Sequence, residues 1–324
     1  MEKLLEVKNL SVTFRTLMGE VQAVRDISFD IEKGSVTAIV GESGCGKSVT
    51  SKSIMGLIKK PGMIASDSQI IFQGEDIQKY TKKQWEEYRG QKCAICFQDA
   101  LTALNPTMTI GRQIMEKIRV HKKVGKKEAW NEAVKMLKLV GIPNPELRMR
   151  QYPHEFSGGM RQRVMIAIAM TLNPTLLIAD EPTTALDVTV QADILDMMKR
   201  IQKEHHMSII LITHDLGIVA NFATNIIVMY AGKIVESGSA EDIFYCPTHP
   251  YTQALLRAVP RLDMNDEQLE SIEGTPPNMI NPPAGCPFEQ RCKFNQDICG
   301  QSCPGEIEIS KGHKVSCWLQ KEGK

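Results

Sequence analysis

The chain has 324 residues, enough for one large or two moderate domains with a buried core. Its 39 lysine and arginine residues nearly balance its 38 acidic residues, which argues against a nucleic-acid-binding protein because such domains are usually basic. Residues 1–6 lack the apolar core of a signal peptide, and no window approaches the roughly 20 apolar residues of a membrane span. We therefore expect a cytosolic chain that reaches a membrane only through a partner.

The first part of the chain is mainly β-strand in pattern. Residues 4–14 and 21–40 contain short alternations of apolar and polar side chains, with a turn at residues 32–34, and residues 93–97 form a further candidate strand. From about residue 99 to 160 the pattern is helical. This order predicts strands followed by a helical insertion.

Buried strands return further along the chain, at residues 175–179 and 208–212, with the apolar face of a helix at residues 194–201 between them. This alternation predicts an α/β sheet with parallel strands. After about residue 240, prolines and glycines cluster and a cysteine-rich tail follows. We expect a small separate module there, joined by a semi-rigid linker.

A phosphate-binding loop gives the clearest chemical signal. Residues 41–48 follow the pattern G-x-x-x-x-G-K-[ST], after an apolar strand at 36–40 and before a helix-compatible stretch at 49–58. The glycines let several backbone N–H groups point at one anion, and the following helix adds its positive end. Lys47 is suited to neutralise the β- and γ-phosphates, and Ser48 to hold Mg²⁺. The residues predicted to contact the nucleotide here are Gly41, Ser43, Gly44, Cys45, Gly46, Lys47, Ser48 and Val49.

A pair of carboxylates follows the buried strand near residue 178. Asp180 is placed to orient Mg²⁺ or its waters, and Glu181 to polarise the attacking water as a general base. An apolar strand that ends in Asp-Glu is common by itself. After a phosphate loop at this distance, the pair indicates hydrolysis of a nucleotide.

A Ser-Gly-Gly sequence precedes a helix-compatible run at 161–172 and predicts another helix N-terminus open to anions, with a simple capped helix as the alternative. Its residues are Ser157, Gly158 and Gly159. At this point the chain resembles the ATP-binding-cassette (ABC) ATPases, whose signature is typically L-S-G-G-Q. Phe156 and Met160 stand in place of the Leu and the Gln, whereas the Ser-Gly-Gly core is intact.

Further residues resemble family motifs in the family's order. Gln98 resembles the Q-loop glutamine that senses Mg²⁺ and contacts transmembrane partners, and Ala185-Leu186-Asp187 resembles the D-loop. His214 resembles the switch histidine that contacts the γ-phosphate. Phe14 is a candidate for the aromatic residue that stacks on adenine, with core packing as the alternative. The resemblance implies catalytic roles for Lys47, Gln98, Glu181 and His214, a nucleotide contact for Asp187, and Mg²⁺ coordination by Ser48, Gln98 and Asp180.

The resemblance also implies the fold, a P-loop NTPase of the α/β class. We expect an ABC nucleotide-binding domain with a RecA-like core, an antiparallel β subdomain, a helical subdomain and a cysteine-rich C-terminal extension. The expected boundaries are 1–98 and 162–240 for the core with its β subdomain, 99–161 for the helical signature subdomain, and 241–324 for the extension.

The chain carries one phosphate loop and one signature. In ABC proteins the signature helix faces a second subunit, so two complete sites imply two chains arranged head to tail. ATP would draw the two chains together, and hydrolysis assisted by Glu181 would let them part, a reaction in which positioning and charge neutralisation dominate.

The tail resembles one subfamily. Segments 249–256, 274–277, 285–288 and 291–292 resemble the C-terminal extension of the ATP-binding subunits of dipeptide and oligopeptide importers, with the nickel importers as near relatives. The implied function is ATP binding and hydrolysis that energises peptide import. The alternatives are a nickel or other small-solute importer, or a soluble ABC ATPase without a transport role.

The resemblance implies several partners. These are a second ABC ATPase subunit, which the subfamily favours as a homologue in a heterodimer, and two transmembrane permease subunits. A peptide-binding protein would act indirectly, and no nucleic acid is expected. The implied location is the cytoplasmic face of the cell membrane, as a peripheral protein.

Five of the nine cysteines lie in the tail. Clustered thiolates in a cytosolic protein favour a soft metal, and four of them suit either Zn²⁺ or a [4Fe–4S] cluster. Some members of the resembling subfamily carry an iron–sulfur cluster in this extension, so we expect a cluster, with Zn²⁺ and with unliganded or oxidised thiols as the alternatives. The expected ligands are Cys286, Cys292, Cys299 and Cys317, with Cys303 as a possible replacement for Cys299.

Overall fold

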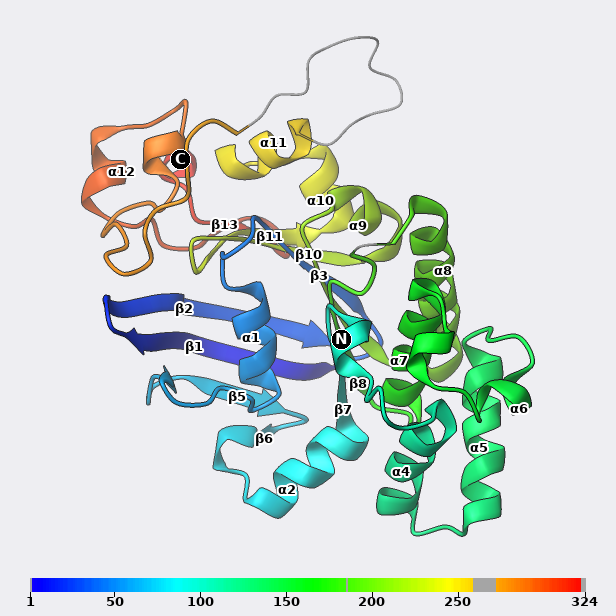
Figure 1. Cartoon of the computed structure of the whole chain (residues 1–324). Coiled ribbons are helices and arrows are strands. Elements are labelled where there is room, and N and C mark those ends of the chain that lie inside the picture. Colours follow the sequence, from blue (N-terminus) through cyan, green and yellow to red (C-terminus); the bar gives the residue numbers. More distant parts are fainter. Residues whose placement is uncertain (1, 185, 259–271, 322–324) are drawn as a thin grey trace. The chain divides into compact units, whose positions relative to one another are not determined.

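The computed structural model describes residues 2–184, 186–258 and 272–321 (Figure 1). The chain divides into two compact units, the first formed by residues 1–78 and 212–324 and the second by residues 79–211. Strand β9 (Ser208–Thr213) contains the point at which the chain passes from the second unit to the first. Ala185, which begins the predicted D-loop, lies outside the described residues.

The first unit contains an antiparallel sheet of strands from the start of the chain. Its order is β2-β1-β5-β6, and β4 also pairs with β1. Figure 1 shows β1, β2 and β5 side by side. The bounds are β1 Lys3–Thr16, β2 Gly19–Glu32, β4 Gly62–Ile64, β5 Gln69–Phe72 and β6 Glu75–Asp76. The apolar faces of these strands are buried through Leu5, Val7, Leu10, Ile27, Ile31, Ile70 and Phe72.

A second set of strands in the same unit carries the phosphate loop. Its order is β12-β13-β11-β10-β3, with β10 and β3 parallel and the other pairs antiparallel. The bounds are β3 Val36–Val40, β10 Asn225–Tyr230, β11 Lys233–Ser239, β12 Ile307–Ser310 and β13 His313–Val315. All five residues of β3 are buried, as expected for an apolar strand of a parallel pair.

Short helices complete the first unit. They are α1 Lys47–Ile54, α9 Leu216–Phe222, α10 Ala240–Tyr245, α11 Pro250–Arg257 and α12 Asp297–Gln301, with 3₁₀ turns Ile77–Lys79, Glu289–Arg291 and Trp318–Gln320. Helix α1 is shorter than the stretch at 49–58 predicted from sequence, because the backbone of Gly56 has a positive φ of 59° and ends it.

The second unit is mainly helical. Helix α4 packs against α5, and both contact α7. Its helical bounds are α2 Lys82–Glu87, a π-helical turn Tyr88–Lys92, α3 Ala100–Ala103, α4 Ile110–Lys122, α5 Lys126–Leu139, α6 Pro145–Arg148, a 3₁₀ turn Pro153–Glu155, α7 Gly158–Met170 and α8 Val188–His205. Strands β7 (Cys93–Cys96) and β8 (Leu176–Asp180) form a parallel pair in this unit.

The helix ends in the second unit follow from local sequence. Gly141 has a φ of 74°, and its N–H donates to the carbonyl of Lys138 just after α5. A glycine in this conformation ends the helix. Among the described residues no helix is both long enough and apolar enough to cross a lipid bilayer.

Candidate nucleotide site

The phosphate loop follows β3, at the end of a buried parallel strand pair. Gly41 has a φ of 148°, and a Cβ there would lie 2.1 Å from the carbonyl oxygen of Met229. Gly46 has a φ of 105°, and a Cβ there would lie 2.5 Å from the carbonyl oxygen of Ala23. Only glycine fits at these two positions, so the sequence folds into a loop whose backbone lies directly on β10 and β2. Such a bare backbone is the surface that a phosphate-binding loop needs.

The side chain of Lys47 forms hydrogen bonds to the backbone of its own loop. Its ammonium group donates to the carbonyl oxygens of Gly41 at 2.7 Å and Glu42 at 2.9 Å, and the residue is 5% exposed. Lys47 is also the first residue of α1, so Ser48 and the positive end of the helix dipole lie at the same place. The loop therefore combines N–H groups, a cation and a hydroxyl within one short segment, which fits a nucleotide triphosphate with Mg²⁺.

Two other predicted residues belong to the first unit. His214 follows β9 and is exposed, and the next residue, Asp215, accepts a 2.8 Å hydrogen bond from the N–H of Gly217 to start α9. Phe14 lies on β1, half-buried, with its ring 2.6 Å from the position that a Cβ of Gly62 would take. Its ring thus packs on the neighbouring strand β4. The adenine contact of Phe14 and the phosphate contact of His214 stay predictions.

In the second unit the parallel pairing brings two predicted residues together. Cys96 of β7 is in register with Ala179 of β8, so the residues that follow both strands emerge at one edge. There the side-chain amide of Gln98 donates a 2.8 Å hydrogen bond to the carboxylate of Glu181. The hydroxyl of Thr184 donates to the same carboxylate oxygen at 3.0 Å. The carboxylate is therefore held in one orientation by two neutral donors.

The backbone at Glu181 is unusual. Its φ is 48°, in the left-handed region that residues with a Cβ rarely adopt. Asp180, just before it, is 6% exposed at the end of β8. A strained non-glycine residue next to a buried carboxylate is typical of functional sites, because the surrounding structure has to hold it there.

The Ser-Gly-Gly segment forms the N-terminus of α7. The hydroxyl of Ser157 accepts a 3.4 Å hydrogen bond from the N–H of Met160, so Ser157 is the N-cap. A Cβ at Gly159 would lie 2.7 Å from the side chain of Val190, which shows that this glycine permits close approach of α8. Asp187 caps α8 by accepting a 2.9 Å hydrogen bond from the N–H of Val190. Two predicted motifs therefore meet through Val190.

The signature residue that departs from the family pattern has a packing role. Phe156 is 3% exposed, and the guanidinium of Arg148 lies 5.6 Å from the centre of its ring. The side chain of Phe156, which is larger than the usual leucine, thus packs into the core of the second unit just before α7. The next two residues, Ser157 and Gly158, remain exposed.

Sequence reasoning missed one part of the site. The carboxylate of Glu42, inside the phosphate loop, pairs with Arg291 of the C-terminal extension at 2.9 Å. The N–H of Glu42 donates to the hydroxyl of Tyr251 at 3.0 Å. Glu42 occupies an unspecified position of the loop pattern, and its partners lie more than 200 residues away, so no local signal indicated them.

The expectation of a metal centre in the extension is wrong. In the parts of the chain that the structure describes, no group of three or more His, Cys, Asp or Glu residues could hold a metal ion. The proposed ligands Cys286, Cys299 and Cys317 are buried free thiols, and Cys292 and Cys303 are half-buried. Burial raises the pKa of Cys286 to about 12 and that of Cys317 to about 11, which favours the neutral thiol at physiological pH. Because no such ligand group is present, the described residues of the extension offer no site for an iron–sulfur cluster or a zinc ion.

The physical reason lies in how the extension is anchored. A bound metal is one way to hold a small cysteine-rich module together. Instead, a guanidinium N–H of Arg25 donates to the carbonyl of Pro283 at 2.8 Å, and the N–H of Gln22 donates to the carbonyl of Met279 at 2.8 Å. Strand β13 pairs with β11, and Phe288 is buried. Ordinary hydrogen bonds and packing on the first unit therefore hold the extension.

Comparison with known families agrees with these observations. The ABC transporter family matches residues 24–184, and the family described as the oligopeptide/dipeptide transporter C-terminal region matches residues 235–299. The first match includes the phosphate loop, the signature and the Asp-Glu pair. The second includes Tyr251 and Arg291.

Relatives of known role match almost the whole chain. The dipeptide transport ATP-binding protein DppD of Bacillus subtilis is 54% identical over 99% of this chain and 96% of its own length. The oligopeptide transport ATP-binding protein OppD of the same organism is 52% identical over 98% of this chain and 89% of its own length. OppD of Escherichia coli is 47% identical over 99% and 94%.

Solved structures share the fold. The chain matches cbiO1 of Clostridium perfringens, part of an ABC transporter complex, with a TM-score of 0.65 and 29% identity over 75% of this chain and 91% of that one. It also matches a dimeric ATP-binding cassette bound to ADP and Pi with a TM-score of 0.66 and 23% identity, over 73% and 99% of the two chains. The chain therefore belongs to the ATP-binding proteins of dipeptide and oligopeptide ABC transporters, and it is an ATPase of that family.

Proposed function

We propose that this chain is the ATP-hydrolysing subunit of a transporter that imports dipeptides or oligopeptides. The observation that carries the proposal is the presence of two family matches in one chain, a cassette at 24–184 and a peptide-transporter extension at 235–299. Relatives named as dipeptide and oligopeptide transport ATP-binding proteins, 54% and 52% identical over nearly the full length, support the same solute class.

In this proposal the phosphate loop binds the triphosphate of ATP. The N–H groups of residues 41–48 donate to phosphate oxygens, and Lys47 exchanges its loop carbonyls for the β- and γ-phosphates. His214 contacts the γ-phosphate. Ser48, Gln98 and Asp180 would hold Mg²⁺ or its waters, and the ion would supply positive charge against the triphosphate.

The second unit supplies the group that activates water. Glu181 accepts a proton from the water that attacks the γ-phosphorus in line with the departing ADP, so that the oxygen–phosphorus bond to ADP breaks as the new bond forms. Gln98 and Thr184 keep the carboxylate of Glu181 oriented for this step, which their hydrogen bonds to it support. The strained backbone of Glu181 further restricts its direction.

A second cassette completes each site in this proposal. Ser157, Gly158 and Asp187 are exposed at the starts of two helices, where N–H groups and a helix dipole favour an anion. They would contact the ATP bound to the other cassette, head to tail. A dimeric structure of a cassette with the same fold supports the pairing of two cassettes, and we propose a homologous chain as the partner.

The import of peptides would require further partner proteins. Two permease subunits would carry the peptide across the bilayer, a peptide-binding protein would deliver it, and this chain would lie peripherally on the cytoplasmic face of the membrane.

Reconstitution tests the proposal. The full complex in proteoliposomes, with Mg-ATP on the side of the cassettes, should take up a labelled dipeptide or tripeptide only while ATP is hydrolysed. The same complex with Glu181→Gln in this chain should lose ATP-driven uptake. Uptake of Ni²⁺ in place of peptides would overturn the solute class, and peptide uptake that is independent of ATP would overturn the role of this chain.

A further inference from the structure

Arg291 connects the C-terminal extension to the phosphate loop. One of its terminal guanidinium nitrogens donates to both carboxylate oxygens of Glu42, at 3.1 and 2.9 Å, and to the hydroxyl of Tyr230 at 3.0 Å. The side chain of Arg291 is 6% exposed and that of Glu42 is 24% exposed. The ion pair is therefore largely shielded from water and is stronger than a surface pair.

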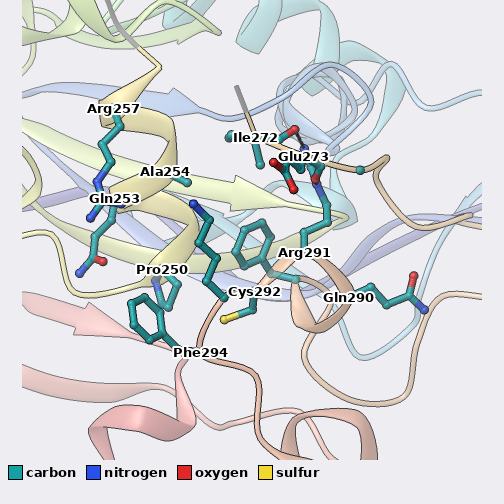
Figure 2. Close-up of a pocket in the computed structure, with 13 residues that line it drawn as sticks. Pro250, Gln253, Ala254, Arg257, Ile272, Glu273, Gln290, Arg291, Cys292 and Phe294 are labelled. Atoms are coloured by element: carbon teal, nitrogen blue, oxygen red, sulfur yellow. Dashed lines mark hydrogen bonds between the residues drawn. The ribbon is translucent and has the colours of Figure 1, made fainter. Parts of the chain in front are cut away.

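The other nitrogens of this guanidinium are fixed by the extension itself. Its Nε donates to the carbonyl oxygen of Glu273 at 2.9 Å, and its second terminal nitrogen donates to that of Ile272 at 3.0 Å. Figure 2 shows Arg291 beside Ile272 and Glu273, on the wall of a cavity of about 390 Å³ that the extension forms with α11. The extension therefore sets the direction in which Arg291 points, and that direction is toward Glu42.

A cluster of aromatic rings holds the same loop residue through its backbone. The hydroxyl of Tyr251 accepts the N–H of Glu42 at 3.0 Å. The ring of Tyr251 packs on Tyr230 at 4.6 Å and on Phe288 at 5.3 Å between centroids, and all three rings are buried. Phe288 directly precedes the turn that carries Arg291. One rigid group of side chains thus holds both the side chain and the N–H of Glu42.

We propose that Arg291 is a positioning residue of the phosphate loop, through which the C-terminal extension sets the affinity for ATP. The inference rests on the proposed role of residues 41–48 in binding the triphosphate. Glu42 is held at its carboxylate by Arg291, at its N–H by Tyr251 and at its carbonyl by Lys47. When the ammonium group of Lys47 leaves the loop carbonyls to bind phosphate, the contacts of Arg291 and Tyr251 continue to hold Glu42 in place.

Charge gives Arg291 a second effect. Glu42 places a carboxylate inside a loop that binds a polyanion, and this repulsion would weaken ATP binding. Arg291 neutralises that carboxylate and draws it toward the extension. Removal of Arg291 would therefore release the loop and leave an uncompensated negative charge beside the phosphates.

The test measures Mg-ATP affinity of the full-length chain by competition with a fluorescent ATP analogue. Arg291→Met should weaken the binding of Mg-ATP by about tenfold. This is the size of change expected when a shielded charge loses its partner and the change is coupled to a ligand bound nearby. Glu42→Gln should change affinity by about twofold or less, because the amide keeps the shape without the charge. The double variant Arg291→Met with Glu42→Gln should bind more tightly than Arg291→Met, because the repulsion has been removed, and less tightly than Glu42→Gln, because residue 42 has lost its contact with the extension.

Lys293→Met is the matched control, since Lys293 lines the same cavity and is exposed. It should leave ATP affinity unchanged. Thermal unfolding of each variant separates positioning from folding. Unchanged ATP affinity in Arg291→Met, with only a lower unfolding temperature, would overturn the inference, as would a double variant no better than Arg291→Met. Failure of the wild-type chain itself to bind Mg-ATP would instead overturn the proposed function of the loop.

Discussion

The side-chain amide of Gln98 donates a 2.8 Å hydrogen bond to the carboxylate of Glu181. The two residues are 83 positions apart in the chain. They meet because β7 and β8 are parallel and in register, so that their carboxyl ends lie at one edge. An amide donor leaves the carboxylate its negative charge and fixes its direction, which is the combination that a general base needs.

Replacement of Glu181 by Gln should remove the base and keep the shape of the site. We expect ATP hydrolysis by the assembled transporter to fall by about 10²- to 10⁴-fold, the usual contribution of a general base. ATP binding should persist, since an amide still accepts the hydrogen bond from Thr184. Steady-state phosphate release and equilibrium ATP binding measure the two quantities separately.

Gln98→Ala provides the matched comparison. It removes the orienting amide and keeps the base, so hydrolysis should fall by a smaller factor, about tenfold. In the double variant Gln98→Ala with Glu181→Gln, the part of the loss that acts through the carboxylate should not add to that of Glu181→Gln, so any further loss measures the contact of Gln98 with Mg²⁺ or its waters. Full turnover in Glu181→Gln would remove the assignment of the base.

Much of the fold could be read from the sequence because its signals are local. The buried strands β3, β8 and β9 were visible as apolar runs, and the start of α7 was visible as a Ser-Gly-Gly sequence. The phosphate loop was visible because its glycines, lysine and serine follow a fixed spacing, and the close approach of Met229 to Gly41 shows why one of these positions requires glycine. The capping of α8 by Asp187 is a local effect of the same kind.

The relationships that the sequence could not predict depend on distant partners. Arg291 and Glu42 are 249 positions apart, and nothing in either local sequence indicates the other. The cysteine tail led to an incorrect prediction because neither the clustering of cysteines in the sequence nor the subfamily resemblance says what surrounds each thiol in this chain. Burial of Cys286 and the hydrogen bonds that anchor the extension through Pro283 are properties of the folded unit.

Gly41 and Gly44 provide a test of the loop backbone. Both have a positive φ, but a Cβ at Gly41 would lie 2.1 Å from the carbonyl oxygen of Met229, whereas a Cβ at Gly44 would meet no atom within 4 Å. Gly44→Ala should therefore cost only the backbone strain, about 1 kcal/mol of unfolding free energy. Gly41→Ala should cost about 3 kcal/mol or more, because the main chain of β10 has to move.

Denaturant unfolding of the two variants, followed by circular dichroism, measures the difference. The comparison is internal, because both substitutions add the same methyl group to the same loop. Equal stability of the two variants would contradict the close packing of the loop on β10.

His249 gives the structure a specific sensitivity to acid. It is 1% exposed at the start of α11, and its Nδ1 accepts the N–H of Tyr251 at 3.0 Å. Burial lowers the pKa of His249 to about 3. The nearby carboxylate of Glu236 accepts the backbone N–H of His249 at 3.0 Å and is itself buried. The imidazole is therefore neutral in the folded chain over the physiological range.

The direction of the pH effect on stability follows from the pKa of His249 in the unfolded and in the folded chain. The unfolded chain binds a proton at His249 below its ordinary pKa of about 6.5, whereas the folded chain does so only near 3, so this residue contributes stability that is lost as pH falls from 6.5 to 3. At pH 5 the loss should reach about 2 kcal/mol. His249→Asn keeps an acceptor for the N–H of Tyr251 and has no proton to bind, so it should be less sensitive to acid by that amount.

Unfolding free energies of the wild type and His249→Asn at pH 7, 6 and 5 measure this difference, and all other titrating groups cancel in the comparison. His206→Asn is the control, because His206 is exposed at the end of α8 with a φ of 50° that Asn readily adopts. Its stability should vary with pH as the wild type does. A His249→Asn chain that loses stability between pH 7 and 5 as steeply as the wild type would show that the buried imidazole takes up its proton in the folded state, and that the cap at α11 tolerates it.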